Sequence, residues 1–346
     1  MTFRAFTFFL GCLAVLAFCL PAHGKEANMD KMPAARAFAR EMREWHNLDE
    51  AELLRRFAKL KPDQRVLKLI APSAAPEQQR SWQRYQGRFL DPKRIGQGVD
   101  FWQQHAALLK RAEAAYGVPA EVIVSIIGIE TFYGQNTGTF NTFSALATLA
   151  FYYPQRATFF RQELEQLLLL AAENRRNPES YTGSYAGAIG IPQFMPGSQR
   201  RYAVDFDGDG VIDLANSVAD AIGSVASFLA AHGWQKGAPV AVPARLPERL
   251  PPQTLATWLD TGIRPVLSTL ALLAAGVAIE PIEGTDRNAA LIDLVTPDAP
   301  VEYWLGFENF YVITRYNRSS FYAMAVFQLA EALKKEKGLG SKYDYE

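Results

Sequence analysis

Apolar residues recur every three or four positions over most of the chain, which is the pattern of amphipathic helices. The pattern predicts helices over residues 32–45, 49–61, 99–116, 119–133, 144–150, 156–174 and 319–335. Asn47 or Asp49 is expected to cap the second of these helices, because a short polar side chain there can accept a bond from a free backbone amide. We therefore expect a helical domain over residues 25–100, followed by a helical core from residue 101.

After Trp234 the pattern changes to proline-rich segments with β-branched residues, which is typical of strands. The predicted strand segments cover residues 239–246, 267–282 and 289–295, with turn signals between and after them. Helical periodicity then returns. The sequence thus predicts a mainly α (α+β) fold, in which a small antiparallel β domain over 237–300 is inserted between core segments 101–236 and 301–346.

The first 24 residues have the pattern of a secretory signal peptide. Arg4 precedes an almost unbroken apolar run to Pro21, and small residues lie at the third-last and last positions before a cut after Gly24. Cleavage there would give an exported, periplasmic protein. A retained membrane anchor is the alternative, because the run approaches the ~20 residues that span a bilayer, but the small-residue cut site argues against it.

Both cysteines, Cys12 and Cys19, lie inside this segment, so the mature chain would contain neither a disulfide nor a thiolate metal site. A lipid anchor at Cys19 is a second alternative. The bulky Phe18 before it fits poorly with the small residue that lipoprotein processing prefers. A soluble periplasmic protein is therefore the favoured interpretation.

Composition and charge exclude some partners. The 346 residues are 49% hydrophobic and 21% charged, as in an ordinary globular protein. Lys+Arg and Asp+Glu both number 36, and no basic run alternates with aromatic residues. Because nucleic-acid binders carry a basic patch or stripe, no nucleic acid is expected as a partner.

Glu130 is the main candidate for chemistry. It ends an apolar helix and lies on the same stripe as Ile123, Ile126 and Ile127, with no Lys or Arg three or four positions away. Burial would raise the pKa of its carboxyl group, and so would the negative end of the helix dipole near the break expected at Gly134. Glu130 should then donate a proton near neutral pH. The alternative is a helix-end glutamate that points into solvent.

The segments around Glu130 are poor in acidic residues. There is no Asp or Glu between Thr131 and Gln162, or between Ser180 and Val204; aromatic, amide and hydroxyl side chains stand there instead. Such side chains suit a sugar polymer, because aromatic faces stack on sugar rings and amides bond to hydroxyls. Some of these aromatics fit a core role better, namely Phe151, Phe159 and Phe160.

An ordinary glycosidase uses two carboxyl groups, and only one is obvious here. A single carboxyl group suffices if Glu130 protonates the glycosidic oxygen and then accepts a proton from a hydroxyl of the same sugar, which closes an intramolecular ring. A hydrolytic lysozyme and a peptidoglycan-binding module without catalysis stay open as alternatives. The chain has no glycine-rich phosphate loop, no zinc motif and only four histidines.

Residues 205–213 match positions 1 to 9 of an EF-hand loop. Position 12, normally Glu, is Asn216, and the nearest later carboxylate is Asp220. We expect a structural Ca²⁺ ion here, with its ligands drawn from Asp205, Asp207, Asp209, Val211, Asp213 and Asp220. An Asp-Gly turn without metal is the alternative. No organic cofactor is expected.

The chain resembles the lytic murein transglycosylase B family. The motifs that carry the resemblance span about residues 80 to 330 and lie at 130–131, 133–134, 183–190, 193–196, 203–206, 208–210, 221–226, 231–234 and 313–319. The calcium loop is one residue longer before Asp220 than the family pattern, which puts the last ligand in doubt. The family's lipoprotein signal is missing, so the chain resembles a soluble member.

The resemblance implies a lysozyme-like helical core, a helical N-terminal domain, a small β domain and a calcium site. It implies non-hydrolytic cleavage of the β-1,4 bond between N-acetylmuramic acid and N-acetylglucosamine, leaving a 1,6-anhydro end. The implied partners are peptidoglycan glycan strands and other cell-wall enzymes. Glu130 matches the family's catalytic residue, and the positions that match its glycan groove are Tyr85, Arg156, Ser184, Gln193, Phe194, Tyr316, Asn317 and Tyr322.

Overall fold

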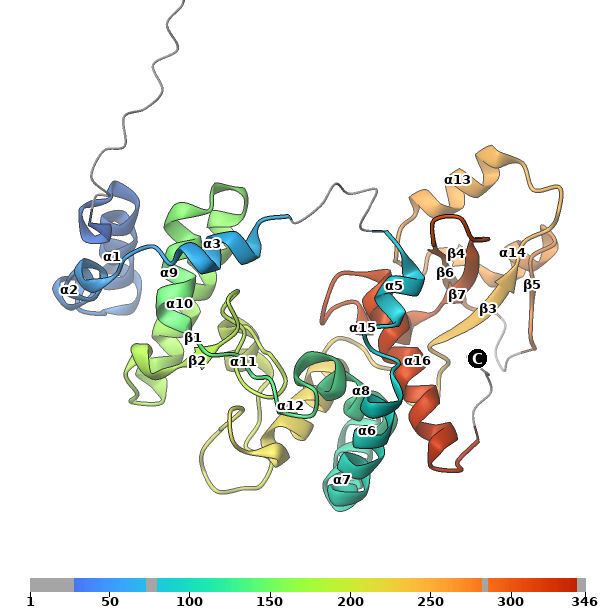
Figure 1. The fold of residues 1–346 in the computed structure, drawn as a ribbon, viewed down its shortest axis with the longest axis horizontal. Coiled ribbons are helices and arrows are strands. Elements are labelled where there is room, and N and C mark those ends of the chain that lie inside the picture. Colours follow the sequence, from blue (N-terminus) through green and yellow to red (C-terminus); the bar gives the residue numbers. More distant parts are fainter. Residues whose placement is uncertain (1–27, 73–79, 282–285, 341–346) are drawn as a thin grey trace, which may run out of the picture. The chain divides into compact units, whose positions relative to one another are not determined.

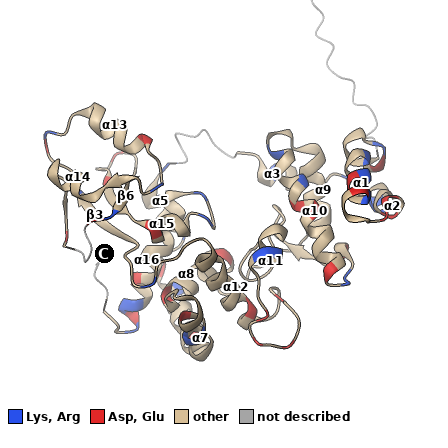
Figure 2. Cartoon of the chain, turned by 180° about the vertical axis from the view of Figure 1, so that it is seen from behind, with Lys and Arg blue, Asp and Glu red and all other residues tan. Residues whose placement is uncertain are grey.

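A computed structural model describes residues 28–72, 80–281 and 286–340 (Figure 1). The predicted signal peptide, with both cysteines, lies outside these residues. The chain divides into two compact units, which meet in sequence between Lys61 and Pro62. Charged residues of both signs are mixed along the helices (Figure 2).

In its described part, residues 28–61, the first unit contains the helices η1 (Met29–Lys31), α1 (Pro33–His46) and α2 (Glu50–Lys59). Of the two predicted caps, Asp49 caps α2: its side chain accepts a bond of 3.0 Å from the amide of Glu52. The aromatic rings of Phe38 and Phe57, 6.2 Å apart, form the buried centre of the unit.

The helices of the second unit surround α8 (Ala120–Thr131), in which nine of the 12 residues are buried. A helix that is apolar on every side is stable only inside a core. The helices in contact with it are α6 (Pro92–Gln104), α7 (Ala106–Tyr116), α12 (Val218–Ala231) and α16 (Ser320–Glu336). Glu130 is therefore carried by the most buried helix of this unit.

Other helices of the second unit precede and follow this group along the chain. They are α3 (Gln64–Ile70), α5 (Trp82–Gln86), α9 (Thr142–Tyr152), η2 (Pro154–Arg156), α10 (Ala157–Glu173), η3 (Pro178–Ser180), α11 (Pro196–Tyr202) and α15 (Glu308–Ile313). A two-stranded sheet joins β1 (Phe140–Asn141) to β2 (Thr182–Gly183). Within the described ranges no single helix has the length and apolar composition of a membrane span. Helices α7 and α8 meet these two criteria only when they are taken together, and the pair is bent by 113°.

A five-stranded antiparallel sheet follows, in the order β4-β6-β7-β3-β5. Its strands are β3 (Ala241–Arg245), β4 (Leu267–Ser268), β5 (Ala278–Ile279), β6 (Asn288–Leu294) and β7 (Glu302–Gly306). Alternate residues face opposite sides. Ile292 and its partner Trp304 pack into the helical core, whereas Leu291 and its partner Leu305 form a second core with side chains of α13 (Pro252–Asp260) and α14 (Thr269–Ala274).

The structure confirms the predicted fold class, a helical majority with a small antiparallel sheet. Two predicted elements differ. The helix expected over 99–116 is interrupted at His105, between α6 and α7. The strand expected over 267–282 contains α14, because the side chain of Ser268 caps a run of helix-forming Leu and Ala residues that ends before Gly276.

Candidate active site

Glu130 lies in the last turn of α8, where the buried helix reaches the surface of the core and its side chain is only partly exposed. The helix ends after Thr131, because Phe132, Tyr133 and Gly134 have left-handed backbones with φ of 52°, 61° and 86°. The predicted break at Gly134 thus begins two residues earlier. The hydroxyl of Thr131 donates a 2.8 Å bond to the carbonyl of Ile191, which ties the helix end to a second segment of the site.

Tyr322 contacts Glu130 directly. Its hydroxyl donates a hydrogen bond of 2.6 Å to Oε1 of the carboxyl group. Tyr322 lies in the first turn of α16, whose start is capped by Ser319. The ring of Tyr316 is stacked on that of Tyr322, with centroids 6.4 Å apart and planes at 15°, and its own hydroxyl donates to the carbonyl of Pro192 at 2.6 Å. Two tyrosines of the C-terminal segment therefore form one side of the site.

Burial raises the pKa of Glu130 to about 7, and the hydrogen bond from Tyr322 acts in the opposite direction. Tyr85, Tyr316 and Tyr322 all face the carboxylate. Burial raises the pKa of each hydroxyl, and the nearby charge of Glu130 raises it further, to about 12 for Tyr85. Among the described residues no cation pairs with Glu130. The carboxyl group is therefore protonated below pH 7 and surrounded by neutral phenols.

Tyr85 reaches the site from α5. Its ring packs against Phe321 at 5.7 Å and Phe89 at 5.2 Å. Phe321 lies next to Tyr322 in α16, so the same helix holds both tyrosines in place. The structure therefore brings together four predicted residues from segments distant in sequence: Glu130, Tyr85, Tyr316 and Tyr322.

The predicted residues of the glycine-rich segment hold that segment together. The side-chain amide of Gln193 donates to the carbonyls of Thr137 at 3.0 Å and Gly190 at 2.9 Å. The hydroxyl of Ser184 accepts from the amide of Ala188 at 3.1 Å. Both side chains remain half-exposed, so each could still meet a ligand.

Phe194, Arg156 and Asn317 are placed differently. Phe194 is only 2% exposed and packs beneath the ring of Tyr316, with centroids 5.7 Å apart. Arg156 is exposed and stacks on the rings of Phe159 and Phe160. Asn317 is exposed in the turn after α15. None of the three is hydrogen-bonded to Glu130.

Sequence reasoning missed two residues that support the site, Thr131 and Arg94. The guanidinium of Arg94 is bonded to the carbonyl of Gly128 in the last turn of α8. No sequence signal marks Arg94, since it lies 36 positions before Glu130 and in another helix. Thr131 is adjacent to the catalytic candidate, but its bond to Ile191 depends on tertiary packing.

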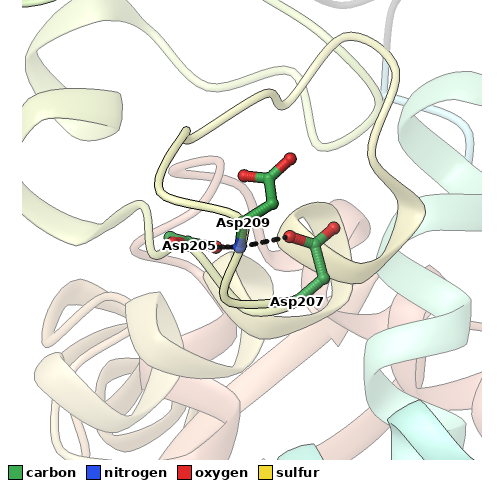
Figure 3. Close-up of side chains that lie close together, drawn as sticks. All are labelled: Asp205, Asp207 and Asp209. Carbon is green, nitrogen blue, oxygen red and sulfur yellow. Dashed lines mark hydrogen bonds between the residues drawn. The ribbon is translucent and has the colours of Figure 1, made fainter.

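The acidic loop forms a candidate metal centre. One carboxylate oxygen each from Asp205, Asp207 and Asp209 lie within 4.8 Å of one another (Figure 3). Asp205 also accepts bonds from the amides of Gly208 and Gly210 at 2.7 and 2.8 Å, and these bonds lower its pKa. Three hard oxygen donors at this spacing suit a divalent cation such as Ca²⁺.

The other predicted ligands have different surroundings. The fully buried carboxylate of Asp220 accepts one 2.8 Å bond from the amide of Phe206 and another from that of Asp213, so it joins the two ends of the loop. The carboxylate of Asp213 accepts from Ala215 and Asn216 in its own turn. Val211 is 57% exposed. The converging cluster therefore comprises Asp205, Asp207 and Asp209, and the carboxylates of Asp213 and Asp220 bond to amides elsewhere in the loop.

A half-buried carboxylic acid without a cationic partner, bonded to a tyrosine and carried by a helical core, is a group that can donate and accept a proton. The sequence matches the family described as transglycosylase SLT domain over residues 30–331. This match covers most of the chain, so the chain belongs to that family. The prediction that the chain is an enzyme of the lytic transglycosylase class is confirmed.

The chain is similar in sequence to known lytic transglycosylases over most of its length. It is 42% identical to the membrane-bound lytic murein transglycosylase B of Escherichia coli (strain K12) over 310 residues, 87% of this chain and 82% of the relative. The soluble lytic transglycosylase SltB1 from Pseudomonas aeruginosa is 45% identical with a TM-score of 0.80, over 88% of this chain and 100% of SltB1.

Two further solved structures contain ligands. The Escherichia coli lytic transglycosylase Slt35 in complex with calcium is 40% identical, with a TM-score of 0.76 over 89% of this chain and 95% of Slt35. SltB3 from Pseudomonas aeruginosa in complex with NAG-NAM-pentapeptide is 32% identical, with a TM-score of 0.72 over 86% of this chain and 78% of SltB3.

Proposed function

We propose that this chain is a lytic transglycosylase of peptidoglycan, which cleaves the β-1,4 bond between N-acetylmuramic acid and N-acetylglucosamine without water. One observation carries the proposal: within the described ranges, the ionisable groups that interact with Glu130 are phenols, and no second carboxyl group is among them. Burial and Tyr322 alone set the pKa of Glu130, with no contribution from another carboxylate. A two-carboxylate glycosidase holds its groups roughly 5 to 10 Å apart, close enough for each to influence the other.

The geometry supports a two-step use of the same carboxyl group. Glu130 first donates its proton to the glycosidic oxygen, and the bond from the anomeric carbon to that oxygen breaks. The 6-hydroxyl oxygen of the same muramoyl residue then attacks the anomeric carbon, and its proton passes to the Glu130 carboxylate. The acid is regenerated, and no water is consumed. Attack within one sugar is favoured because the hydroxyl is already in place.

Tyr322 assists the first step. Its hydroxyl donates to the carboxylate that remains after the proton has left, and a bond to the charged form stabilises that form. Burial has the opposite effect on the carboxylate. Together they give a pKa of about 7, which suits a group that both donates and accepts a proton near neutral pH.

The substrate class rests on the named relatives. One is a murein transglycosylase, and another, SltB3, is solved in complex with NAG-NAM-pentapeptide. The tyrosines around Glu130 provide aromatic faces for sugar rings.

Export with removal of residues 1–24 is also part of the proposal. The intact mass of the mature protein tests it, because an uncleaved chain would retain Cys12 and Cys19.

Mass spectrometry of the products released from purified sacculi tests the reaction. We expect muropeptides that end in 1,6-anhydro-muramic acid, each one water lighter than the reducing-end product. Reducing ends would instead identify a hydrolytic lysozyme. Binding to sacculi with no released product would identify a peptidoglycan-binding module without catalysis.

We also propose a structural Ca²⁺ ion in the loop of Asp205, Asp207 and Asp209, because the three carboxylates converge and Slt35 is solved in complex with calcium. Saturating Ca²⁺ is expected to raise the melting temperature, and a chelator should reverse the rise, since a ligand that binds only the folded state stabilises it by about 2.7 kcal/mol at 100 times its Kd. Mg²⁺ should be less effective, because it requires a tighter octahedral shell.

A matched variant distinguishes a bound ion from a general salt effect. The carboxylate of Asp209 is exposed and accepts a single bond, from the amide of Val211. Asp209→Asn should therefore melt like the wild type in chelator but lose the response to Ca²⁺. A wild-type protein that shows no shift at saturating Ca²⁺ would leave an Asp-Gly turn without metal as the correct interpretation.

A further inference from the structure

The turn that follows Glu130 is strained. Phe132 and Tyr133 both have left-handed backbones, with φ of 52° and 61°. In this region the Cβ atom of a non-glycine residue crowds a carbonyl oxygen, so single residues adopt it only where their surroundings compensate. Strain of this kind is concentrated at functional sites. Here it lies two and three positions after the catalytic candidate.

Two glycines make room for the side chain of Tyr133. A Cβ atom on Gly98, in α6, would lie 2.4 Å from the Tyr133 hydroxyl, and one on Gly128, in α8, would lie 2.7 Å from its ring. The hydroxyl donates a 2.9 Å hydrogen bond to the carbonyl of Arg94. The ring is thus fixed between two helices, and with it the turn that ends α8.

Arg94 completes the attachment from α6. Its guanidinium donates to the carbonyl of Gly128, which also accepts from the amide of Phe132. The same guanidinium lies 4.6 Å from the centroid of the Phe132 ring and donates a second bond, of 3.2 Å, to the carbonyl of Arg88. A cation at the negative end of a helix is also favoured by the helix dipole. Arg94 therefore contacts the chain on both sides of Glu130, at Gly128 within α8 and at Phe132 just after it.

We propose that Arg94 and Tyr133 are positioning residues for Glu130: they fix the last turn of α8 so that the Glu130 carboxyl stays buried against Tyr322. The inference rests on the proposed function of Glu130. It concerns placement of the backbone and not charge, because the ion pair of Arg94 is with Asp91, at 3.6 Å, and not with Glu130. The ionisable groups that face Glu130 are Tyr85, Tyr316 and Tyr322.

The test compares Tyr133→Phe and Arg94→Lys with the wild type in the cleavage of glycan strands. Tyr133→Phe keeps the ring in its space and removes only the hydroxyl bond. We expect kcat per folded molecule to fall at least about tenfold with KM within twofold, since a misplacement near 1 Å can reduce the rate about a hundredfold. Arg94→Lys keeps the cation but lacks the planar fork needed for both carbonyls, so a smaller loss is expected.

The pH profile separates positioning from general stability. Glu130 must be protonated to act as an acid, so the activity of the wild type should fall above pH 7, where the carboxyl group loses its proton. In Tyr133→Phe a less buried carboxyl has a lower pKa, and this alkaline limb of kcat/KM should move to lower pH. Arg36→Gln is the control: it removes a guanidinium–carbonyl bond outside the core, to Asp30, and should leave the profile unchanged.

Other results would overturn the inference. Three results would each show that Arg94 and Tyr133 do not position Glu130. They are an unchanged kcat, a raised KM, and a loss of activity that is equal at every pH and leaves the alkaline limb of kcat/KM where it is in the wild type. If Tyr133→Phe fails to fold, the position of the alkaline limb in the pH profile of Arg94→Lys tests the inference instead. Glu130→Gln in the same assay keeps the two questions apart: if it stays active the proposed mechanism fails, and if it is inactive while the limb is unmoved only the positioning role fails.

Discussion

Replacing Glu130 by glutamine is expected to abolish glycan cleavage and leave the fold intact. A positioned acid–base group contributes about 10²- to 10⁴-fold, and here one group serves in both proton transfers, so the loss should reach the upper end of that range. Glutamine has nearly the same shape and can still accept the hydrogen bond from Tyr322. The melting temperature should be unchanged or higher, because a desolvated ionisable group has been replaced by a neutral one.

The same helix provides a matched control. Glu121 lies in the first turn of α8, is half-buried, and has a pKa that burial raises above its ordinary value. Glu121→Gln should therefore retain wild-type cleavage, since this carboxyl is at the opposite end of the helix from Tyr322. The muropeptides released per unit time by both variants measure the difference. Activity of Glu130→Gln within about tenfold of the wild type would exclude the acid–base role.

Asp220→Ala is expected to cause a large loss of stability. The side chain is fully buried and accepts two hydrogen bonds, from the amides of Phe206 and Asp213. A bond to a charged group contributes about 1.5–3 kcal/mol, and the substitution removes the partner of two backbone amides. The free energy of unfolding should therefore fall by about 3 kcal/mol or more, which corresponds to roughly 6 °C in melting temperature.

Melting curves in chelator measure this effect without any contribution from a metal ion. Asp213→Ala is the comparison, because its carboxylate bonds only to residues of its own turn, Ala215 and Asn216. That variant should lose less than half as much stability. Equal losses in the two variants would contradict the idea that Asp220 fastens the two ends of the loop.

Several features could be predicted because they are local. Helix α8 follows from apolar residues on all sides of one segment, and the cap of α2 from the side chain of Asp49. The convergence of Asp205, Asp207 and Asp209 follows from their alternation in a tight turn. In each case the controlling interactions lie within a few residues of the chain, so the pattern of residue types is enough.

The burial of Glu130 was also predictable in part, because its helix must be inside the protein. The resulting pKa of Glu130 could not be predicted, because it also depends on the hydrogen bond from Tyr322, which lies 192 positions further along the chain. The same is true of Phe194, whose place beneath Tyr316 removes it from the surface. The sequence pattern shows an aromatic residue but not the ring that will cover it.

The sequence by itself determined the helical class, the family and the acidic loop, and it made Glu130 the candidate acid. Only the tertiary structure decided which residues meet Glu130, that Asp220 bonds to two backbone amides, and that Arg94 reaches the end of α8. The physical reason is the range of the interactions. Periodicity and capping act between neighbours in the chain, whereas hydrogen bonds between helices and the pKa of a buried acid depend on how distant segments pack.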